Sequence, residues 1–466
     1  ARHLLAGHGM RTDVIHPPLW ALRDSDLTVP VLVHGPLMAM LVAPMLVAFG
    51  PAALDHLAWL GALAAALGAL STFRLGARAF GAAGGAAAAA LFTIAPLTLR
   101  AVHHDPSLLV GAALLTFAID RLAGERAEPL AAGIAIGLAS LARVEMLACA
   151  VLLLPLAGRR GAPRLMAGAM ACALPWWMHN ARATGQPFFN LSSYLLIGYW
   201  GARPELTVLR DFSLAPSGFP GALSATLPAL TAKWMDFLPH AIKRALLVPT
   251  GASGWLAIPG AALSAFAPEG GARNERSARG PARVSAARVR KLALASIAIA
   301  CVPLAIMTIT LYDSRYLTPF LPLWCLAAAR GAEGMSRVLP PWGQRPRAWI
   351  GALALLALPT ALPTMKDAAR EARALDSRLA SERAALRPSA DGSRRLMFSD
   401  SPDFVAFTTR RPVVWVSEAE FRRLAALTGP VESTRSEALA AAGATPADLW
   451  FHDRDADAAE PRNSGR

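Results

Sequence analysis

Four short polar clusters interrupt a largely apolar sequence, and they hold the residues whose types could do chemistry. The first cluster contains Arg100, His103, His104 and Asp105, where one apolar stretch ends and the next begins. An acid beside two histidines could bind a metal ion or a phosphate, or relay a proton. Spacing alone favours a different role, in which Asp105 caps the following helix just before Pro106.

The second cluster consists of Arg143 and Glu145, between two short apolar segments. Ionisable residues at membrane depth are costly and are usually functional. An internal Arg–Glu pair that holds a tight helical hairpin explains the same pattern equally well. The spacing does not decide between these two interpretations.

The third cluster lies in the segment PWWMHNARATGQPFFN at 175–190. Paired tryptophans at a helix end are typical of the aromatic belt at a membrane surface, and this explains Trp176 and Trp177. It explains His179, Asn180, Arg182 and the following Gly-x-Pro less well.

The fourth cluster is YDSRYLTPFLP at 312–322, which places Arg315 beside Tyr316 at the end of an apolar run. A snorkelling arginine is the simpler explanation of this position. The sequence contains no CxxC, HExxH or GxSxG motif, and the glycines at 81–91 lie inside an apolar stretch with no strand before them. Any chemistry must therefore come from polar residues in the loops.

The composition indicates a membrane protein. The 466 residues include 46 Lys and Arg against 32 Asp and Glu, a net charge of +14. Hydrophobic residues make up 54% and charged residues 17%, whereas soluble domains contain about 25% charged residues. The high apolar and low charged content excludes an intrinsically disordered chain. The arginines form short bursts between apolar runs, so the expected partner is a lipid bilayer and not a nucleic acid.

Ten apolar stretches could cross a hydrocarbon layer about 30 Å thick. Every second loop between them is rich in arginine, including the loops expected around Arg74 and Arg78, which fits one consistent orientation. The segment 35–50 is expected to lie at the outer interface, although a spanning helix is an alternative. The ten stretches are 57–73, 83–99, 106–119, 129–142, 146–157, 165–178, 245–266, 292–311, 316–329 and 348–365.

After residue 366 the composition changes. An amphipathic connecting helix is expected at 366–387, followed by the strands RRLMFSD, FVAFTT, PVVWV and DLWFHD and a helix capped by Ser417. The expected fold is an all-α polytopic membrane domain of about ten transmembrane helices with a small C-terminal α/β extracytoplasmic domain. The expected parts are an outer loop with a juxtamembrane helix at 1–56, a transmembrane domain at 57–365 that includes the outer loop 179–244, and the outer domain at 366–466.

Two of the clusters resemble motifs of the polytopic GT-C glycosyltransferases. ALPWWMHNARATGQPFF resembles their PW-x-x-R/H-N-x-x-x-x-G-x-P stretch, and SRYLTPFLP resembles their R-Y-x-x-P-x-x-P stretch. This superfamily includes protein O-mannosyltransferases and the bacterial aminoarabinose transferase that modifies lipid A. Weaker matches follow in the same order over most of the chain: ARHLLAGHG, HGPLMAMLVAPMLVAFG, GARAFG, HHDPSLLVGAALL and SDSPDFVAFTTRRPVVW.

The resemblance implies transfer of a hexosyl or pentosyl group from a polyprenyl-phosphate donor to a lipid, glycan or protein acceptor. Transfer would occur on the outer side of a bacterial cytoplasmic membrane, usually with inversion. Asp105 falls on the family's second acidic position and is the expected catalytic residue. Guanidinium groups suit phosphate because they form bidentate hydrogen bonds. The residues expected to bind the donor phosphate are Arg315, Tyr316, Arg143, His34, His103, His179 and Arg182.

The chain departs from the family pattern in its first loop. The family's general base is expected a few residues before Ala1, so the chain is expected to be an N-terminal truncation. Where the aminoarabinose transferase has Glu-Lys-Pro-Pro-Leu, residues 33–37 read Val-His-Gly-Pro-Leu, and His34 replaces the lysine. A metal site that uses that glutamate is not carried over, and a divalent cation is expected only if other acids substitute. Candidates, each also explained by surface solvation, are Asp13, Asp24 and Asp26.

Two other classes of protein fit parts of the pattern. A transporter or flippase of lipid-linked substrates would place its polar residues near the bilayer midplane and show two related halves. Here the polar clusters lie in the expected outer loops and the sequence contains no visible repeat, which favours an enzyme. A catalytically inactive relative that acts as a scaffold is the third interpretation.

Overall fold

The chain forms two compact units in a computed structural model. The helical unit comprises Ala1, 34–179 and 228–373, and the mixed unit comprises 2–33, 180–227 and 374–466. The structure describes residues 1–16, 19, 22, 24–25, 28–32, 35–54, 56–124, 126–191, 224, 238–239, 242–243, 256–266, 286–309, 314–336, 345–385, 397–399, 405, 412–415 and 449–450.

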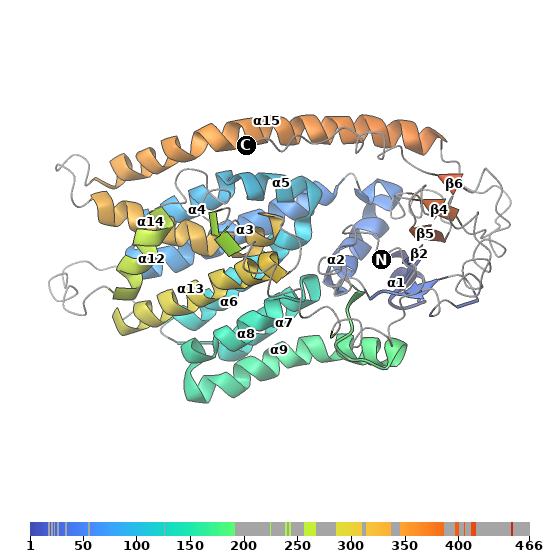
Figure 1. Cartoon of the computed structure of the whole chain (residues 1–466), viewed down its shortest axis with the longest axis horizontal. Helices are drawn as coiled ribbons and strands as arrows, with labels where there is room; N and C mark the ends of the chain where they lie inside the picture. Colours follow the sequence, from blue (N-terminus) through green and yellow to red (C-terminus); the bar gives the residue numbers. More distant parts are fainter. Residues whose placement is uncertain are drawn as a thin grey trace. The chain divides into compact units, whose positions relative to one another are not determined.

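The helical unit is a bundle of helices of unequal length (Figure 1). The last residues of α9 and α15 belong to the mixed unit. The elements are α2 (Leu37–Phe49), η2 (Gly50–Leu54), α3 (Leu57–Phe80), α4 (Ala82–Ile94), α5 (Pro96–His104), α6 (Pro106–Ala123), α7 (Pro129–Ala142), α8 (Met146–Leu152), α9 (Leu154–Thr184), α12 (Ala257–Phe266), α13 (Ala286–Ile309), η8 (Ser314–Phe320), α14 (Leu321–Ser336) and α15 (Pro346–Ala385).

Prolines and glycines determine where several helices begin. Pro96, Pro106 and Pro129 each occupy the first turn of a helix, where the missing N–H costs nothing. Gly81 joins α3 to α4 with a φ of +94°, which a side chain would strain. Pro96 divides the predicted helix 83–99 into two helices, α4 and α5, which meet at an angle of 51°.

Glycines also let pairs of helices approach until their backbones touch. A Cβ on Gly76 of α3 would lie 2.7 Å from the Cα of Gly85 on α4. A Cβ on Gly260 of α12 or on Gly331 of α14 would overlap the backbone of the facing helix. Such contacts between small residues are a main source of helix association in lipid.

The core of the helical unit is built around α6. This helix packs against α3, α5, α7 and η8, and most of its side chains are buried. In contrast, α3 carries a row of exposed large apolar side chains at helical spacing: Trp59, Leu63, Leu67 and Leu70. A helix with an exposed apolar row and a buried opposite side suits a position between lipid and protein.

Two described helices, α3 and α6, are long and apolar enough to cross a membrane. The number rises to five if each of three bent pairs counts as one span: α4 with α5, α8 with α9, and the two halves of the apolar part of α15. The mostly helical architecture with apolar spans is thus confirmed, and α7 coincides with the predicted stretch 129–142. The predicted count of ten spans, and the placement of α2 at the interface, stay predictions.

The mixed unit contains α1 (Arg2–Leu5) and two small sheets. In the first, β1 (Arg11–Thr12) pairs antiparallel with β3 (Val29–Pro30). The second is parallel in the order β2-β5-β4-β6, from β2 (Val14–Ile15), β5 (Val413–Trp415), β4 (Met397–Ser399) and β6 (Leu449–Trp450).

Three of the four predicted C-terminal strands are therefore present. The fourth, FVAFTT, and the helix after Ser417 lie outside the described residues, except for Val405. Residues 366–385 continue α15 as one helix. The strand β2 was not predicted, because nothing in its short sequence reveals its partner. The predicted domain boundaries and the separate outer α/β domain stay predictions.

Candidate active site

Asp105 occupies the corner between α5 and α6. It stands at the N-cap position of α6 with φ −151°, but its side chain caps no backbone N–H among the described residues. Its Oδ2 accepts a hydrogen bond from Arg143 Nη2 at 2.6 Å, and its Oδ1 accepts one from Ser107 Oγ. The predicted position at the helix start is confirmed, whereas the predicted capping role of the carboxylate is wrong. The carboxylate instead joins two corners of the bundle.

Arg143 supplies the other half of this pair, from the corner between α7 and α8. Its side chain is 13% exposed and that of Asp105 is 30% exposed. Arg143 pairs with Asp105. The hairpin interpretation of the sequence pairs it with Glu145 instead. The Arg143 Nε is buried and has no hydrogen-bond partner in the described part of the chain. A buried donor of this kind suits an anionic ligand.

Two further segments reach the helices that carry this pair. Gly35 lies so close to Leu141, two residues before Arg143, that a Cβ on Gly35 would overlap the Leu141 carbonyl. Only glycine fits there, which brings the start of α2 to the end of α7. The segment η8 packs against both α5 and α6, with Pro319 beside Gly111. Segments distant in sequence therefore converge on one set of helices.

Arg315 and Tyr316 lie in the first turn of the segment η8, after Ser314. Leu317 and Phe320 are fully buried and anchor this segment in the bundle. The side chain of Arg315 is exposed, and its guanidinium carbon lies 5.9 Å from the centre of the partly buried Tyr316 ring. At this distance an arginine gains a weak cation–π attraction. The arginine is thus held at the surface by a segment whose apolar residues are fixed.

The described residues at this corner form no cluster of metal ligands. His103 and His104 end α5 with exposed side chains. No three His, Cys, Asp or Glu side chains in the described ranges come together as metal ligands. Asp105 is the acid of the pair, and the positive guanidinium of Arg143 already contacts it. The predicted divalent cation stays a prediction, and no catalytic step below depends on it.

The segment at 175–190 has a structural explanation for most of its pattern. Asn180 is buried, and its Nδ2 donates a hydrogen bond to the Phe189 carbonyl at 2.9 Å. Gly185 follows the end of α9 with a φ of +75°, and its N–H bonds the Ala181 carbonyl at 2.8 Å. This is the usual glycine-terminated end of a helix. The conformation of the turn therefore accounts for the asparagine and the glycine.

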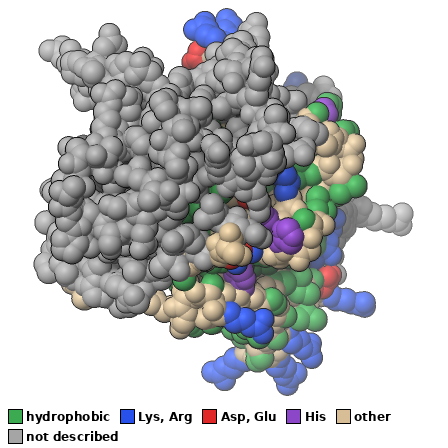
Figure 2. Space-filling model, turned by 90° about the vertical axis from the view of Figure 1, so that its right-hand side faces the viewer, with side chains coloured by type: hydrophobic (Ala, Val, Ile, Leu, Met, Phe, Trp, Pro, Cys, Tyr) green, Lys and Arg blue, Asp and Glu red, His purple; other side chains and the backbone are tan. Residues whose placement is uncertain are grey.

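Two other predicted donor-binding residues, His179 and Arg182, lie near the end of α9. His179 stacks on Trp176, with ring centres 5.0 Å apart and planes at 15°. Arg182 is exposed and belongs to the mixed unit. Figure 2 shows one face of the molecule, where histidine and basic side chains lie among hydrophobic ones. Two predicted candidates lie outside the described residues, His34 and Asp26.

Sequence reasoning missed a second acid–arginine cluster, at the other end of α6. The carboxylate of Asp120 is 2% exposed and lies 2.6 Å from Arg78 Nη1 and 3.5 Å from Arg74 Nε, both on α3. Arg78 also donates to the Asp120 carbonyl at 2.8 Å. The prediction that these arginines lie in a loop is wrong, because α3 extends to Phe80. There was little signal in the sequence, because the predicted stretch ended at 119 and Arg121 stands directly beside Asp120.

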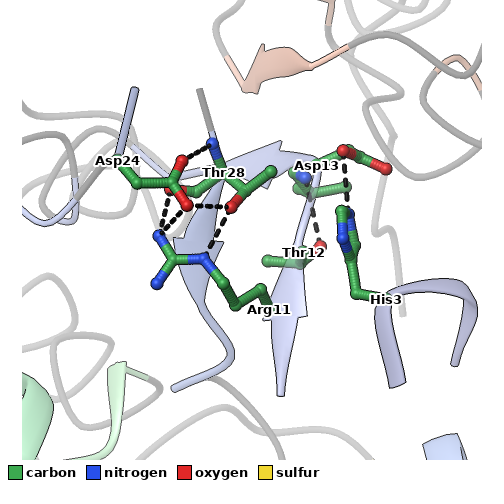
Figure 3. Close-up of polar contacts among 7 residues, drawn as sticks. His3, Arg11, Thr12, Asp13, Asp24 and Thr28 are labelled. Atoms are coloured by element: carbon green, nitrogen blue, oxygen red, sulfur yellow. Dashed lines mark hydrogen bonds and ion pairs between the residues drawn. The ribbon is translucent and has the colours of Figure 1, made fainter. Parts of the chain in front are cut away.

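Figure 3 shows two acids of the first loop, Asp13 and Asp24, in the mixed unit. Asp24 lies 2.9 Å from Arg11 Nη2 and accepts hydrogen bonds from the N–H and the hydroxyl of Thr28. These bonds fold the loop. Asp13 is buried and lies 2.9 Å from Nε2 of His3. For Asp13 the alternative of surface solvation is wrong, because its side chain is 9% exposed.

Comparison with known proteins gives only distant likenesses. No protein-family model matches the sequence, and no curated protein matches it. The crystal structure of the oligosaccharyltransferase of Archaeoglobus fulgidus with Zn and sulfate is 17% identical, with a TM-score of 0.46, over 86% of this chain and 55% of that one. The AglB structure from the same organism, with an inhibitory peptide and a dolichol-phosphate, is 15% identical, with a TM-score of 0.45, over 82% and 56%. The chain spans about half the length of these structures, and likenesses this distant assign it to no family.

Proposed function

We propose that the chain is a membrane glycosyltransferase of the GT-C type. It transfers a sugar from a polyprenyl-phosphate donor to a lipid, glycan or protein acceptor on the outer face of a bacterial cytoplasmic membrane. One observation carries this proposal. The Asp105–Arg143 pair lies on the helices where Gly35 and the segment η8 also pack. Three of the segments that resemble the superfamily thus converge in space.

The proposed reaction is a displacement at the anomeric carbon of the sugar. A nucleophilic atom of the acceptor forms a bond to this carbon, and the bond from the carbon to the phosphate oxygen breaks. The lipid phosphate leaves with the electron pair, and the proton of the acceptor passes to a carboxylate. Each of these changes needs a charged group held in place, because the negative charge on the phosphate grows as the bond breaks.

Asp105, Arg143 and Arg315 have distinct roles in this scheme. Arg143 has a buried donor without a described partner and is held by Asp105, so it is oriented to stabilise the phosphate. Arg315 is exposed on η8 and contacts the donor phosphate from the solvent-facing side. Both oxygens of Asp105 already accept one hydrogen bond, and a carboxylate has about four acceptor positions. Asp105 therefore positions Arg143 and keeps free acceptor positions, one of which takes the proton of the acceptor.

A transfer assay on the full chain in proteoliposomes tests the proposal. Release of polyprenyl phosphate from a labelled donor is measured for wild type, Arg315→Ala and Arg126→Ala. Arg126 is an exposed arginine at the opposite end of α6 and serves as the matched control. We expect Arg315→Ala to lower turnover about 100-fold or more, and Arg126→Ala to leave it unchanged.

Two results would contradict the proposal. Unchanged turnover in both Arg315→Ala and Asp105→Asn would remove these residues from the reaction. Passage of intact donor across the bilayer without release of polyprenyl phosphate would indicate a flippase. Thermal unfolding of each variant in detergent separates loss of chemistry from loss of fold.

A further inference from the structure

A pocket of about 300 Å³ lies in the helical unit, away from the Asp105 corner. Residues of α3, α12, α13 and α14 line it, and nearly all are apolar. The residues of α3 that line the pocket come from the last turns of that helix, near Arg78. Arg78 pairs with Asp120, which lies 15 positions after Asp105 on α6. At about 1.5 Å per residue, the two ends of α6 are about 22 Å apart. The pocket is therefore a different site from the candidate active site.

The shape of the pocket follows from small side chains on one wall and a fixed opposite wall. On α13, Ala293, Ser296 and Ala300 line the pocket at helical spacing and leave a hollow. On the other side, Gly260 and Gly331 hold the backbones of α12 and α14 in direct contact. These two helices cannot shift to fill the space without losing that contact. An empty apolar hollow would forfeit dispersion contacts, so an apolar ligand is expected to fill it.

The side chains at the mouth of the pocket are apolar and exposed. Ile258 of α12 and Ile297 of α13 line the pocket and are 50% and 38% exposed. Leu294 of α13 and Leu263 of α12 are exposed nearby on the same helices. Exposure of such an apolar surface to water is unfavourable, whereas contact with the hydrocarbon chains of a bilayer is favourable. The occupant is therefore expected to enter from lipid.

One end of the pocket is basic. Arg290 and Lys291 are exposed and directly precede the first lining residues of α13. Arg330 lies one turn beyond the lining residues of α14, with its guanidinium carbon 5.9 Å from the ring centre of Phe80, which lines the pocket. The acid that contacts Arg330 there is Glu333, at 2.7 Å. The described charges at this end sum to a positive value, which suits an anionic head group.

We infer that this pocket binds an anionic glycerophospholipid. An acyl chain fills the hollow between α3 and α13, and the phosphate lies at the basic end formed by Arg290, Lys291 and Arg330. Basic residues near a membrane surface attract anionic lipids, and the apolar hollow adds the burial of a chain. The inference is independent of the proposed transferase activity, because it uses neither Asp105 nor Arg315.

The test measures lipid binding to the full chain after removal of native lipid in detergent. Phosphatidylglycerol and phosphatidylcholine with identical chains are titrated and detected by native mass spectrometry. Ala300→Phe fills the hollow, and Ala262→Phe adds the same volume at an exposed position of α12 that does not line the pocket. We expect phosphatidylglycerol to bind more tightly than phosphatidylcholine, and Ala300→Phe alone to weaken it at least about tenfold.

A second pair of variants tests the charges. Arg290→Gln with Lys291→Gln should weaken phosphatidylglycerol binding about fivefold per charge. The matched control, Arg159→Gln with Arg160→Gln, removes an exposed basic pair from α9 and should have no effect. Equal binding of the two lipids, or equal losses in Ala300→Phe and Ala262→Phe, would overturn the inference. Displacement of phosphatidylglycerol by a polyprenyl phosphate probe would assign the pocket to the donor lipid and overturn it too.

Discussion

The Asp105–Arg143 pair allows its contribution to stability to be separated from its contribution to chemistry. Replacing Asp105 by Asn keeps the size of the side chain and removes its charge. The amide oxygen can still accept from Arg143, but the bond of 2.6 Å is no longer charge-assisted, and hydrogen bonds to charged groups contribute about 1.5–3 kcal/mol. Removing one partner of a fully buried pair costs about 3–5 kcal/mol. Because Asp105 is 30% exposed, water offsets part of this, and we expect a loss of about 2 kcal/mol.

A double-mutant cycle measures the coupling between the two residues. Asp105→Asn, Arg143→Gln and the double variant are unfolded in mixed micelles, and their free energies of unfolding are compared with wild type. If the pair is the main interaction of each residue, the double variant loses about as much as either single variant. The coupling energy is then about 2 kcal/mol in magnitude. Sugar transfer is measured on the same three proteins.

Two outcomes would refute this reasoning. Losses that add within about 0.5 kcal/mol would mean that the two side chains do not interact. Wild-type transfer by the double variant would mean that the pair only holds the bundle together. The expected result is a double variant that is as stable as the single variants and has lost transfer.

Two other predictions concern the bundle itself. Arg78→Ala should lower the free energy of unfolding by about 3 kcal/mol because it leaves Asp120 buried without its main partner. Arg74→Ala should cost less than about 1 kcal/mol, since Arg74 is 43% exposed and 3.5 Å away; equal losses in mixed-micelle unfolding would contradict this. Gly260→Leu should abolish the yield of folded protein in gel filtration because α12 and α14 can no longer touch, whereas Gly351→Leu enters open space and should not. Similar yields would show that α12 and α14 do not pack as described.

Helices could be predicted where apolar runs end at clear breaks. The helix α7 begins at Pro129 and ends before Arg143, as the sequence indicates. The longer predicted stretches were less accurate because they passed over internal breaks. Pro96 separates α4 from α5 inside the predicted stretch 83–99, and this break was readable because proline is a recognised helix breaker. The predicted stretch 146–157 passed over the break at Leu153, between α8 and α9. Its predicted end, in contrast, coincides with the bend at Gly158, which has a φ of +70°.

The contacts within the candidate site could not be predicted in the same way. Asp105 and Arg143 were both identified from their residue types, but 38 positions separate them. Their contact depends on how the corner between α5 and α6 packs on the corner between α7 and α8. The same limit applies to β2, which pairs with a strand about 400 positions away in the sequence. Local patterns identify residues that need a partner, while the packing of the whole chain determines which partner they find.

Charged pairs at both ends of the central helix α6 explain why the side chains at the Asp105 corner keep a fixed geometry. At its start, Asp105 is tied to the corner between α7 and α8 through Arg143, and at its other end Asp120 is tied to α3 through Arg78. A helix held at both ends by charged pairs and buried along its length moves little relative to its neighbours. Arg315, in contrast, is exposed on a short segment. We therefore expect any adjustment to a bound donor to occur at Arg315, while Asp105 and Arg143 stay in place, as an electrostatic site that works without reorganisation requires.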